Sequence, residues 1–145
     1  MCIRDSFFDV SISIFGFVIL AASVNYLTAI LGLITVLLYI FIYTPLKKIT
    51  WLNTTIGAIP GAMPALGGWA ASANALDPNA WILFSILFLW QHPHFYAIAL
   101  MCKEDYKKAG FQMLPVIEKE PNRTNRQILW HAFLLDIIPA GIGLD

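Results

Sequence analysis

The sequence predicts an all-α fold, a bundle of helices that crosses a membrane several times. Hydrophobic residues make up 59% of the 145 residues and charged residues only 12%, and the mean hydropathy is +0.70. Several apolar stretches reach the length of a bilayer span, and a soluble domain of this size could not cover so much apolar surface. The formal net charge is zero. We expect the lipid bilayer, and no nucleic acid, as a partner.

The first apolar stretch, Val10–Tyr43, is predicted to form two spans. It contains no ionisable side chain other than tyrosine. As one helix it would be about 51 Å long, against a hydrocarbon core of about 30 Å, so we expect it to fold back on itself. Its most polar interruption is Ser23–Tyr26. We predict the turn there.

Three further spans are predicted over Ile56–Ala73, over Trp81–Met101 and from Leu129 towards the C-terminus, which makes five. The connections then alternate between two sides, and all nine lysines and arginines fall on one of them. Positively charged loops remain on the cytoplasmic side of a membrane. We expect a multi-pass protein of the cell inner membrane, or of the mitochondrial inner membrane, with its basic loops in the cytoplasm or the matrix.

Polar residues interrupt the predicted span Trp81–Met101 near its middle, at Gln91. Side chains at that depth normally face a bundle interior or a cavity. Pro93 is expected to kink the helix, because it donates no backbone hydrogen bond. His92 and His94 lie about 200° apart around a helix, and three interpretations stay open for them: a hydrogen bond between helices, a substrate cavity, or a metal.

A second unusual segment starts at Asn53. Asn53, Thr54 and Thr55 are predicted to cap the helix that follows, and Pro60 and Pro64 predict a bent or broken helix. Small residues recur at four-residue spacing, as they do where membrane helices pack closely. This face serves either close packing or the wall of a substrate cavity; its residues are Gly57, Gly61 and Ala65.

The segment Lys103–Pro115 concentrates charge between two apolar stretches. Three lysines, Glu104 and Asp105 lie within its first six residues. In a chain with so few charges, such a cluster at the mouth of a membrane bundle predicts an ion or anion site. A lysine in such a loop is equally well explained as an anchor that faces lipid headgroups.

Several short motifs follow one another in a set order along the chain. They are Tyr43–Lys48, Asn53–Thr54, Gly57–Pro64, Leu89–Gln91, Pro93–Phe95, Lys103–Tyr106, Ala109–Gly110 and Met113–Pro115. Together they are similar to the protohaem IX farnesyltransferases (haem O synthases), which belong to the UbiA-type intramembrane prenyltransferases. The order and spacing hold from about Phe8 to Ile138, and we expect residues 7–145 to be part of such a domain and residues 1–6 to lie outside it.

The resemblance implies transfer of a farnesyl group from farnesyl diphosphate to a vinyl group of haem b, which gives haem O. It also implies a bundle of nine spans and Mg²⁺ held by two acidic motifs on cytoplasmic loops. Glu104 and Asp105 match the second acidic motif and are the implied metal ligands and catalytic residues, together with Lys48. The implied substrate-binding residues are Lys47, Lys103, Lys107, Lys108, Asn53, Gln91, His94 and Tyr106.

The chain departs from the family at its start, because the first acidic motif is absent before Val10. We therefore expect an internal fragment of about half an enzyme that is inactive alone. Asp136 is expected to face the bundle or to lie near an interface, since a carboxylate at a span centre costs about 2.5–3.5 kcal/mol. The resemblance also implies haem A synthase or terminal oxidase assembly as downstream partners.

Two alternatives belong to other functional classes. Broken helices with polar groups at mid-membrane, as predicted around Pro60 and Gln91, are also typical of transporters and channels. A non-catalytic haem-binding membrane protein would use His92 and His94. The transporter alternative does not explain an acidic pair among lysines in a loop.

Overall fold

The computed structural model describes the backbone of residues 3–120 and 122–142, and the side chains of residues 10–120 and 122–138. Over these residues the chain is helical with connecting loops and contains no strand, which confirms the predicted all-α class. Residues 1 and 2 of the predicted N-terminal extension lie outside this range. The elements are α1 (Ile3–Ser23), α2 (Tyr26–Leu37), the π-helix η1 (Leu38–Tyr43), α3 (Thr44–Leu46), α4 (Asn53–Ala73), α5 (Pro78–Met101), α6 (Lys103–Lys108), α7 (Leu114–Ile117) and α8 (Asn122–Ile142).

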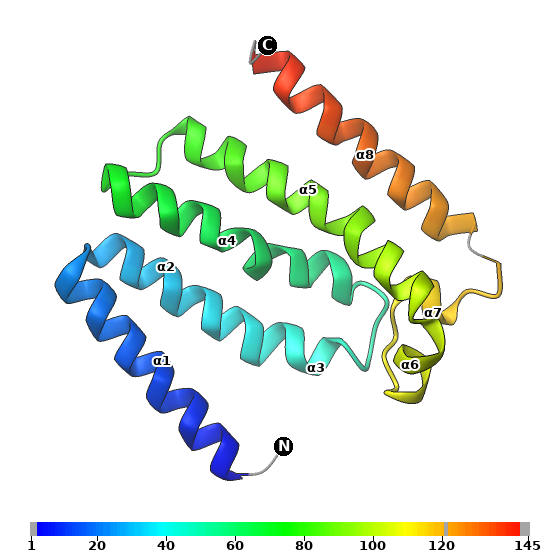
Figure 1. The fold of residues 1–145 in the computed structure, drawn as a ribbon, viewed down its shortest axis with the longest axis horizontal. Helices are drawn as coiled ribbons and strands as arrows, with labels where there is room; N and C mark the ends of the chain where they lie inside the picture. The colour runs from blue at the N-terminus through cyan, green and yellow to red at the C-terminus, as the bar shows by residue number, and fades with distance from the viewer. Residues whose placement is uncertain (1–2, 121, 143–145) are drawn as a thin grey trace.

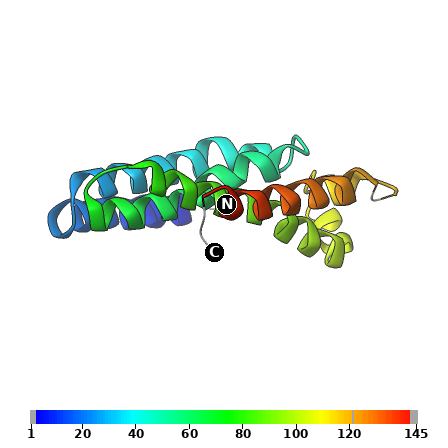
Figure 2. The ribbon, with the colours of Figure 1, turned by 90° about the horizontal axis from the view of Figure 1, so that it is seen from above.

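The long helices lie side by side in chain order, as Figure 1 shows. Helix α1 packs on α2, α2 on α4, α4 on α5, and α5 on α8. Seen from above, they form a shallow layer, from which α6 projects (Figure 2). Within the described residues, each long helix therefore makes its main contacts with its neighbours in this layer, and the short helices α6 and α7 gather at the end of α5.

Five long helical segments occupy the positions of the five predicted spans: α1, α2 to α3, α4, α5 and α8. Two of them are long and apolar enough to cross a membrane by length and composition, namely Tyr26–Leu46 with a hydropathy of 2.3 and Pro78–Met101 with a hydropathy of 1.2. Residues Val10–Ser23 form a shorter apolar helix. The helical bundle is confirmed, with apolarity strongest in its second and fourth members.

The first predicted turn is confirmed, because α1 ends at Ser23 and α2 begins at Tyr26. Asn25 caps α2: its Oδ1 accepts a hydrogen bond of 2.7 Å from the Thr28 amide. The other half of the same side chain, Nδ2, donates to the Ala70 carbonyl of α4 at 2.7 Å. One asparagine therefore starts α2 and attaches the turn to the neighbouring helix.

The predicted cap of α4 is wrong. Leu52 occupies the cap position and makes no side-chain hydrogen bond there, and Asn53 is already helical. The Asn53 amide is used elsewhere, because its Nδ2 donates to the Lys47 carbonyl at 3.3 Å and its Oδ1 accepts from Thr54 Oγ1 at 3.1 Å. Asn53 thus ties the preceding loop to α4 instead of starting the helix.

The prolines do not break their helices. Helix α4 is continuous through Pro60 and Pro64, and α5 is continuous through Pro93. Neighbouring helices can compensate for the hydrogen bonds that proline removes within a membrane bundle. The broken helices on which the transporter alternative depended are therefore not found in α4 or α5.

Helix α8 packs on α5 and carries Asp136 on an exposed surface. Of the two expectations for this residue, burial against the bundle is wrong for the described helices. A position near a membrane interface stays a prediction.

Candidate functional site

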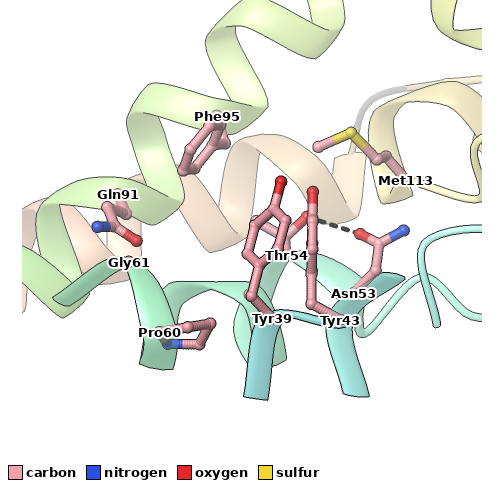
Figure 3. A pocket seen from close by; sticks show the side chains of 10 residues that line it. Tyr39, Tyr43, Asn53, Thr54, Pro60, Gly61, Gln91, Phe95 and Met113 are labelled. Carbon is pink, nitrogen blue, oxygen red and sulfur yellow. Dashed lines mark hydrogen bonds between the residues drawn. The ribbon is translucent and has the colours of Figure 1, made fainter. Parts of the chain in front are cut away.

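A cavity of about 320 Å³ opens between η1, α4, α5 and the loop that follows α6. Figure 3 shows its lining from close by. No lysine, arginine, aspartate or glutamate lines it. We call it the bundle cavity, and its lining residues are Tyr39, Tyr43, Asn53, Thr54, Gly57, Pro60, Gly61, Gln91, Phe95 and Met113.

Two tyrosines from one π-turn form the aromatic wall of the bundle cavity. The Tyr39 and Tyr43 rings lie 5.0 Å apart at 38°, and both hydroxyls point toward the side where Phe95 and Met113 lie (Figure 3). The Tyr39 carbonyl accepts from the backbone amide of Thr44 and, at 2.9 Å, from its hydroxyl. This wider turn sets both rings on one side of the helix, as π-turns often do at functional sites.

Two glycines of α4 make room for these side chains. A Cβ atom at Gly57 would lie 2.6 Å from ring atoms of Tyr43, and one at Gly61 would lie 2.5 Å from Gln91 Oε1. A Cβ at Gly57 would meet a rigid ring, whereas one at Gly61 would displace the flexible end of Gln91; glycine allows the close approach seen at both positions. Gly57 and Gly61 thus allow close packing and also line the bundle cavity; that this cavity holds a substrate stays a prediction.

Gln91 supplies a polar group without a partner. Its side chain is only 8% exposed, and its Oε1 is buried with no hydrogen-bond partner in the part of the chain that the structure describes. A buried acceptor that lacks a partner costs about 1–3 kcal/mol. The bundle cavity therefore contains an amide oxygen suited to accept a hydrogen bond from a water or a ligand.

His92 connects three helices rather than lining the bundle cavity. The side chain is fully buried; its Nδ1 donates to the Phe88 carbonyl at 2.9 Å, and its Nε2 pairs with Thr55 Oγ1 of α4 at 3.2 Å. The ring stacks on His131 of α8 at 3.9 Å and 12°. Among the three interpretations of the histidines, the hydrogen bond between helices is confirmed for His92.

His94 lies apart from this cluster. It is exposed, and its ring stacks on Trp90 at 4.5 Å and 16°. It does not line the bundle cavity. Among the described residues, no three His, Cys, Asp or Glu side chains come together as they would for a metal site of protein ligands alone.

Helix α6 follows α5 directly and carries the predicted acidic pair. Glu104 and Asp105 are exposed in its first turn, and neither carboxylate has a hydrogen bond or ion pair within the described part of the chain. Lys103 differs from them, because its Nζ donates to the Glu118 carbonyl at 2.8 Å. The acidic pair is thus available to a ligand, whereas Lys103 already braces the loop.

A second hollow of about 520 Å³ lies in this loop region. Lys103 and Lys107 of α6 line it, together with a third lysine, Lys119, and apolar side chains. We call it the loop pocket, and its lining residues are Lys103, Lys107, Gly110, Phe111, Gln112, Val116, Ile117, Glu118 and Lys119.

One short segment contributes lining residues to both hollows. Phe111 and Gln112 line the loop pocket, and Met113 lines the bundle cavity. The Gln112 amide donates to the Lys47 carbonyl at 3.1 Å, and Lys47 Nζ lies 5.6 Å from the centroid of the Phe111 ring. The Tyr106 ring lies 5.4 Å from the same ring. This segment is therefore held against both the loop before α4 and helix α6.

The predicted site residues divide among several places. Asn53 and Gln91 line the bundle cavity, and Lys103 and Lys107 line the loop pocket. Lys47 and Tyr106 pack near Phe111. The remaining predicted residues are exposed and line neither hollow: Lys48, Glu104, Asp105, Lys108 and His94.

Sequence reasoning missed Tyr39, Tyr43, Phe95 and Met113 as lining residues. Tyr43, Phe95 and Met113 stand inside the motifs quoted above, which was an available signal. For Tyr39 the only signal was its four-residue spacing from Tyr43 ahead of a proline.

The chain was compared with known proteins. The model of the UbiA prenyltransferase family matches residues 7–144. The protoheme IX farnesyltransferase of Solibacter usitatus is 51% identical over 141 residues, which cover 95% of this chain and 48% of that protein. That of Koribacter versatilis is 52% identical over 114 residues, 78% of this chain and 37% of the relative.

A third relative, the protoheme IX farnesyltransferase of Trichormus variabilis, is 40% identical over 138 residues, 94% of this chain and 43% of that protein. The chain therefore spans about half the length of the curated relatives it matches. No solved structure matches it significantly. Its match to the family model over nearly its whole length shows that the chain belongs to the UbiA prenyltransferase family.

Proposed function

We propose that this chain supplies part of the active site of a membrane enzyme that transfers a farnesyl group from farnesyl diphosphate to a vinyl group of haem b, giving haem O. The observation that carries the proposal is an uncharged cavity within the helices, beside a loop bearing a free carboxylate pair, in a chain 51% identical to a protein named protoheme IX farnesyltransferase. Residues 7–145 would form part of the catalytic domain, with residues 1–6 outside it.

The charged loop suits the diphosphate end of the donor. Mg²⁺ binds through one or two carboxylates together with substrate phosphates, so a pair such as Glu104 and Asp105 fits this mode without further protein ligands. When bound, the ion neutralises charge on the leaving diphosphate. Lys48 and Lys108, both exposed near this loop, would add positive charge from the protein itself.

The bundle cavity suits the apolar carbon chemistry. The carbon–oxygen bond of farnesyl diphosphate breaks, and its electron pair leaves with diphosphate. The vinyl π pair forms the new carbon–carbon bond, and water adds to the resulting cation with loss of a proton. Gln91 Oε1, the buried acceptor without a partner, is suited to hold that water by accepting its hydrogen bond. Phe95 and Met113 offer apolar surface to the prenyl chain.

Membrane location and partners follow from the same proposal. The basic loops would face the cytoplasm of a bacterial inner membrane, or the matrix of a mitochondrion. Haem O would pass to haem A synthase or to terminal oxidase assembly.

A chimera provides the test. The matching segment of the Solibacter usitatus relative is replaced by this chain, and membranes holding the chimera are incubated with haem b and farnesyl diphosphate. We expect farnesylated haem by mass spectrometry, at levels that fall when EDTA removes Mg²⁺. A chimera that inserts in normal amounts yet makes no such product would contradict the proposal. The chain alone should give no product.

A further inference from the structure

The lining of the loop pocket is positive on balance. Lys103, Lys107 and Lys119 line it, and Glu118 is the one acidic residue in its lining. The Glu118 carboxylate is committed to the start of α8, because its Oε2 accepts hydrogen bonds from the Thr124 amide at 3.1 Å and from the Thr124 hydroxyl at 2.8 Å. Hydrogen bonds from a neutral threonine leave this carboxylate charged, so the described lining holds three positive charges and one negative charge, a positive balance.

The loop pocket is also separate from the predicted metal ligands. Lys103 and Lys107 are four residues apart and share one side of α6. Glu104 and Asp105 follow Lys103 by about 100° and 200° around the helix, and neither lines the loop pocket. A diphosphate that needs Mg²⁺ belongs beside the carboxylates. The lysine side is left for an anion that binds without a metal.

The apolar part of the lining narrows the kind of anion. Phe111, Val116 and Ile117 stand among the lysines, which favours carboxylates attached to an apolar body over a free inorganic ion. The segment from Phe111 to Met113 contributes lining residues to both hollows, so the two hollows are neighbours. A flat ligand could therefore present its carboxylates to one hollow and its opposite edge to the other.

We propose that the loop pocket binds the propionate carboxylates of the haem acceptor; this inference rests on the proposed function. The propionates of haem b occupy one edge of the macrocycle and the vinyl groups lie toward the other. Carboxylates in the loop pocket would keep their charge near water, since burying them in the bilayer is costly. The vinyl edge then points into the bundle cavity, toward Gln91. The loop pocket thus orients the acceptor.

The first test measures binding without catalysis. The chain is placed in nanodiscs of zwitterionic phosphatidylcholine and titrated with haem b or with haem b dimethyl ester, whose propionates carry no charge, and the Soret absorbance is followed. We expect the free acid to bind more tightly. The variant Lys107→Gln/Lys119→Gln should bind the free acid about tenfold more weakly and the ester unchanged. Lys103 is left intact because it braces Glu118.

The matched control is Arg123→Gln/Arg126→Gln, which removes the same charge from two exposed residues of α8 outside both hollows. Equal weakening by both double variants, or equal weakening of free acid and ester, would overturn the inference.

The second test separates this inference from the proposed function. In the chimera, Lys107→Gln/Lys119→Gln should raise the KM for haem b about tenfold and leave the KM for farnesyl diphosphate unchanged. A raised KM for farnesyl diphosphate instead would assign the lysines to the diphosphate and overturn the inference while the proposed function stands. If the chimera transfers nothing, the proposed function fails, and the nanodisc titration still decides whether the loop pocket selects carboxylates.

Discussion

The bundle cavity and the loop pocket are both lined by the short segment Phe111–Met113, but charged side chains line only the loop pocket. The bundle cavity is lined by tyrosine, amide, hydroxyl and apolar groups, and the loop pocket by three lysines and one glutamate. A charge near the centre of a bilayer costs about 2.5–3.5 kcal/mol, whereas near the interface lysine interacts favourably with water and headgroups. The division agrees with this cost: charged side chains lie at the loop, and uncharged polar groups lie within the helices.

The two ends of α4 extend this comparison. Toward its C-terminal end, Met63, Leu66 and Ala70 pack with Leu31 and Ala80 in a buried apolar cluster. Toward its N-terminal end, the same helix lines the bundle cavity. The difference arises because Gly57 and Gly61, near the N-terminal end, leave space beside α4. Large polar side chains from η1 and α5 enter this space without filling it.

The largest expected effect concerns the charged loop. In the chimera, Asp105→Asn should lower kcat about 10²- to 10³-fold, since it removes the charge that would hold Mg²⁺ on the diphosphate and keeps the shape. Steady-state turnover with both substrates measures this. The exposed side chain predicts normal insertion. Glu104→Gln, run in parallel, ranks the two carboxylates, and near-normal turnover in both variants would remove the pair from the site.

The next effect concerns the aromatic wall of the bundle cavity. Gly57→Ala places a methyl group 2.6 Å from the Tyr43 ring, and a rigid ring can yield only by moving the turn that holds it. We expect a loss of about 1–3 kcal/mol in stability, measured by thermal or denaturant unfolding in detergent. Gly67→Ala on the same helix is the control, because its Cβ would meet nothing within 4 Å. Equal stability of the two variants would contradict the described packing.

A smaller effect is expected at Gln91, where a substitution should raise stability and impair formation of the hydrated product. Gln91→Met removes an acceptor that lacks a partner, so stability should rise by about 1 kcal/mol. The second effect is on the product. If Gln91 holds the water that adds to the farnesylated cation, the cation in the Gln91→Met chimera should lose a proton without adding water, which gives a product lighter by one water. Unfolding and product mass are measured on the same preparation. An unchanged ratio of hydrated product to the product lighter by one water would exclude the role of Gln91 in holding water.

The sequence predicted the helices well because their signals are local. The polar interruption at Ser23–Tyr26 marked a turn, and bilayer length marked the spans. Gln91 was singled out because a polar side chain in the middle of an apolar span normally faces a bundle interior or a cavity, and the family motifs implied both Asn53 and Gln91 as site residues. These inferences depend on neighbouring residues in the sequence and needed no knowledge of how the helices pack.

The missed features all depend on tertiary contacts. The π-turn that aligns Tyr39 with Tyr43 has no distinct sequence signature, and its rings fit only because Gly57 lies opposite. Asn53 does not cap α4, because its side-chain amide donates to the Lys47 carbonyl in the folded loop. In the sequence of α6 the lysines and the carboxylates form one cluster. In the structure the loop returns near Glu118 and forms a pocket with Lys103 and Lys107, and the two carboxylates lie outside this pocket.

The smallest expected effect distinguishes the two histidines of α5. His94 is exposed and stacked on Trp90, so His94→Ala should change stability by no more than about 0.5 kcal/mol. His92→Ala removes a buried ring that joins Thr55, Phe88 and His131, and should cost several times as much. Unfolding of both variants measures the difference. Haem titration of the stable His94→Ala variant then tests the predicted substrate contact directly. A changed Soret spectrum or a changed affinity supports the contact. If both are unchanged, His94 is not part of the haem site, and the loop pocket and the bundle cavity are left to hold the acceptor.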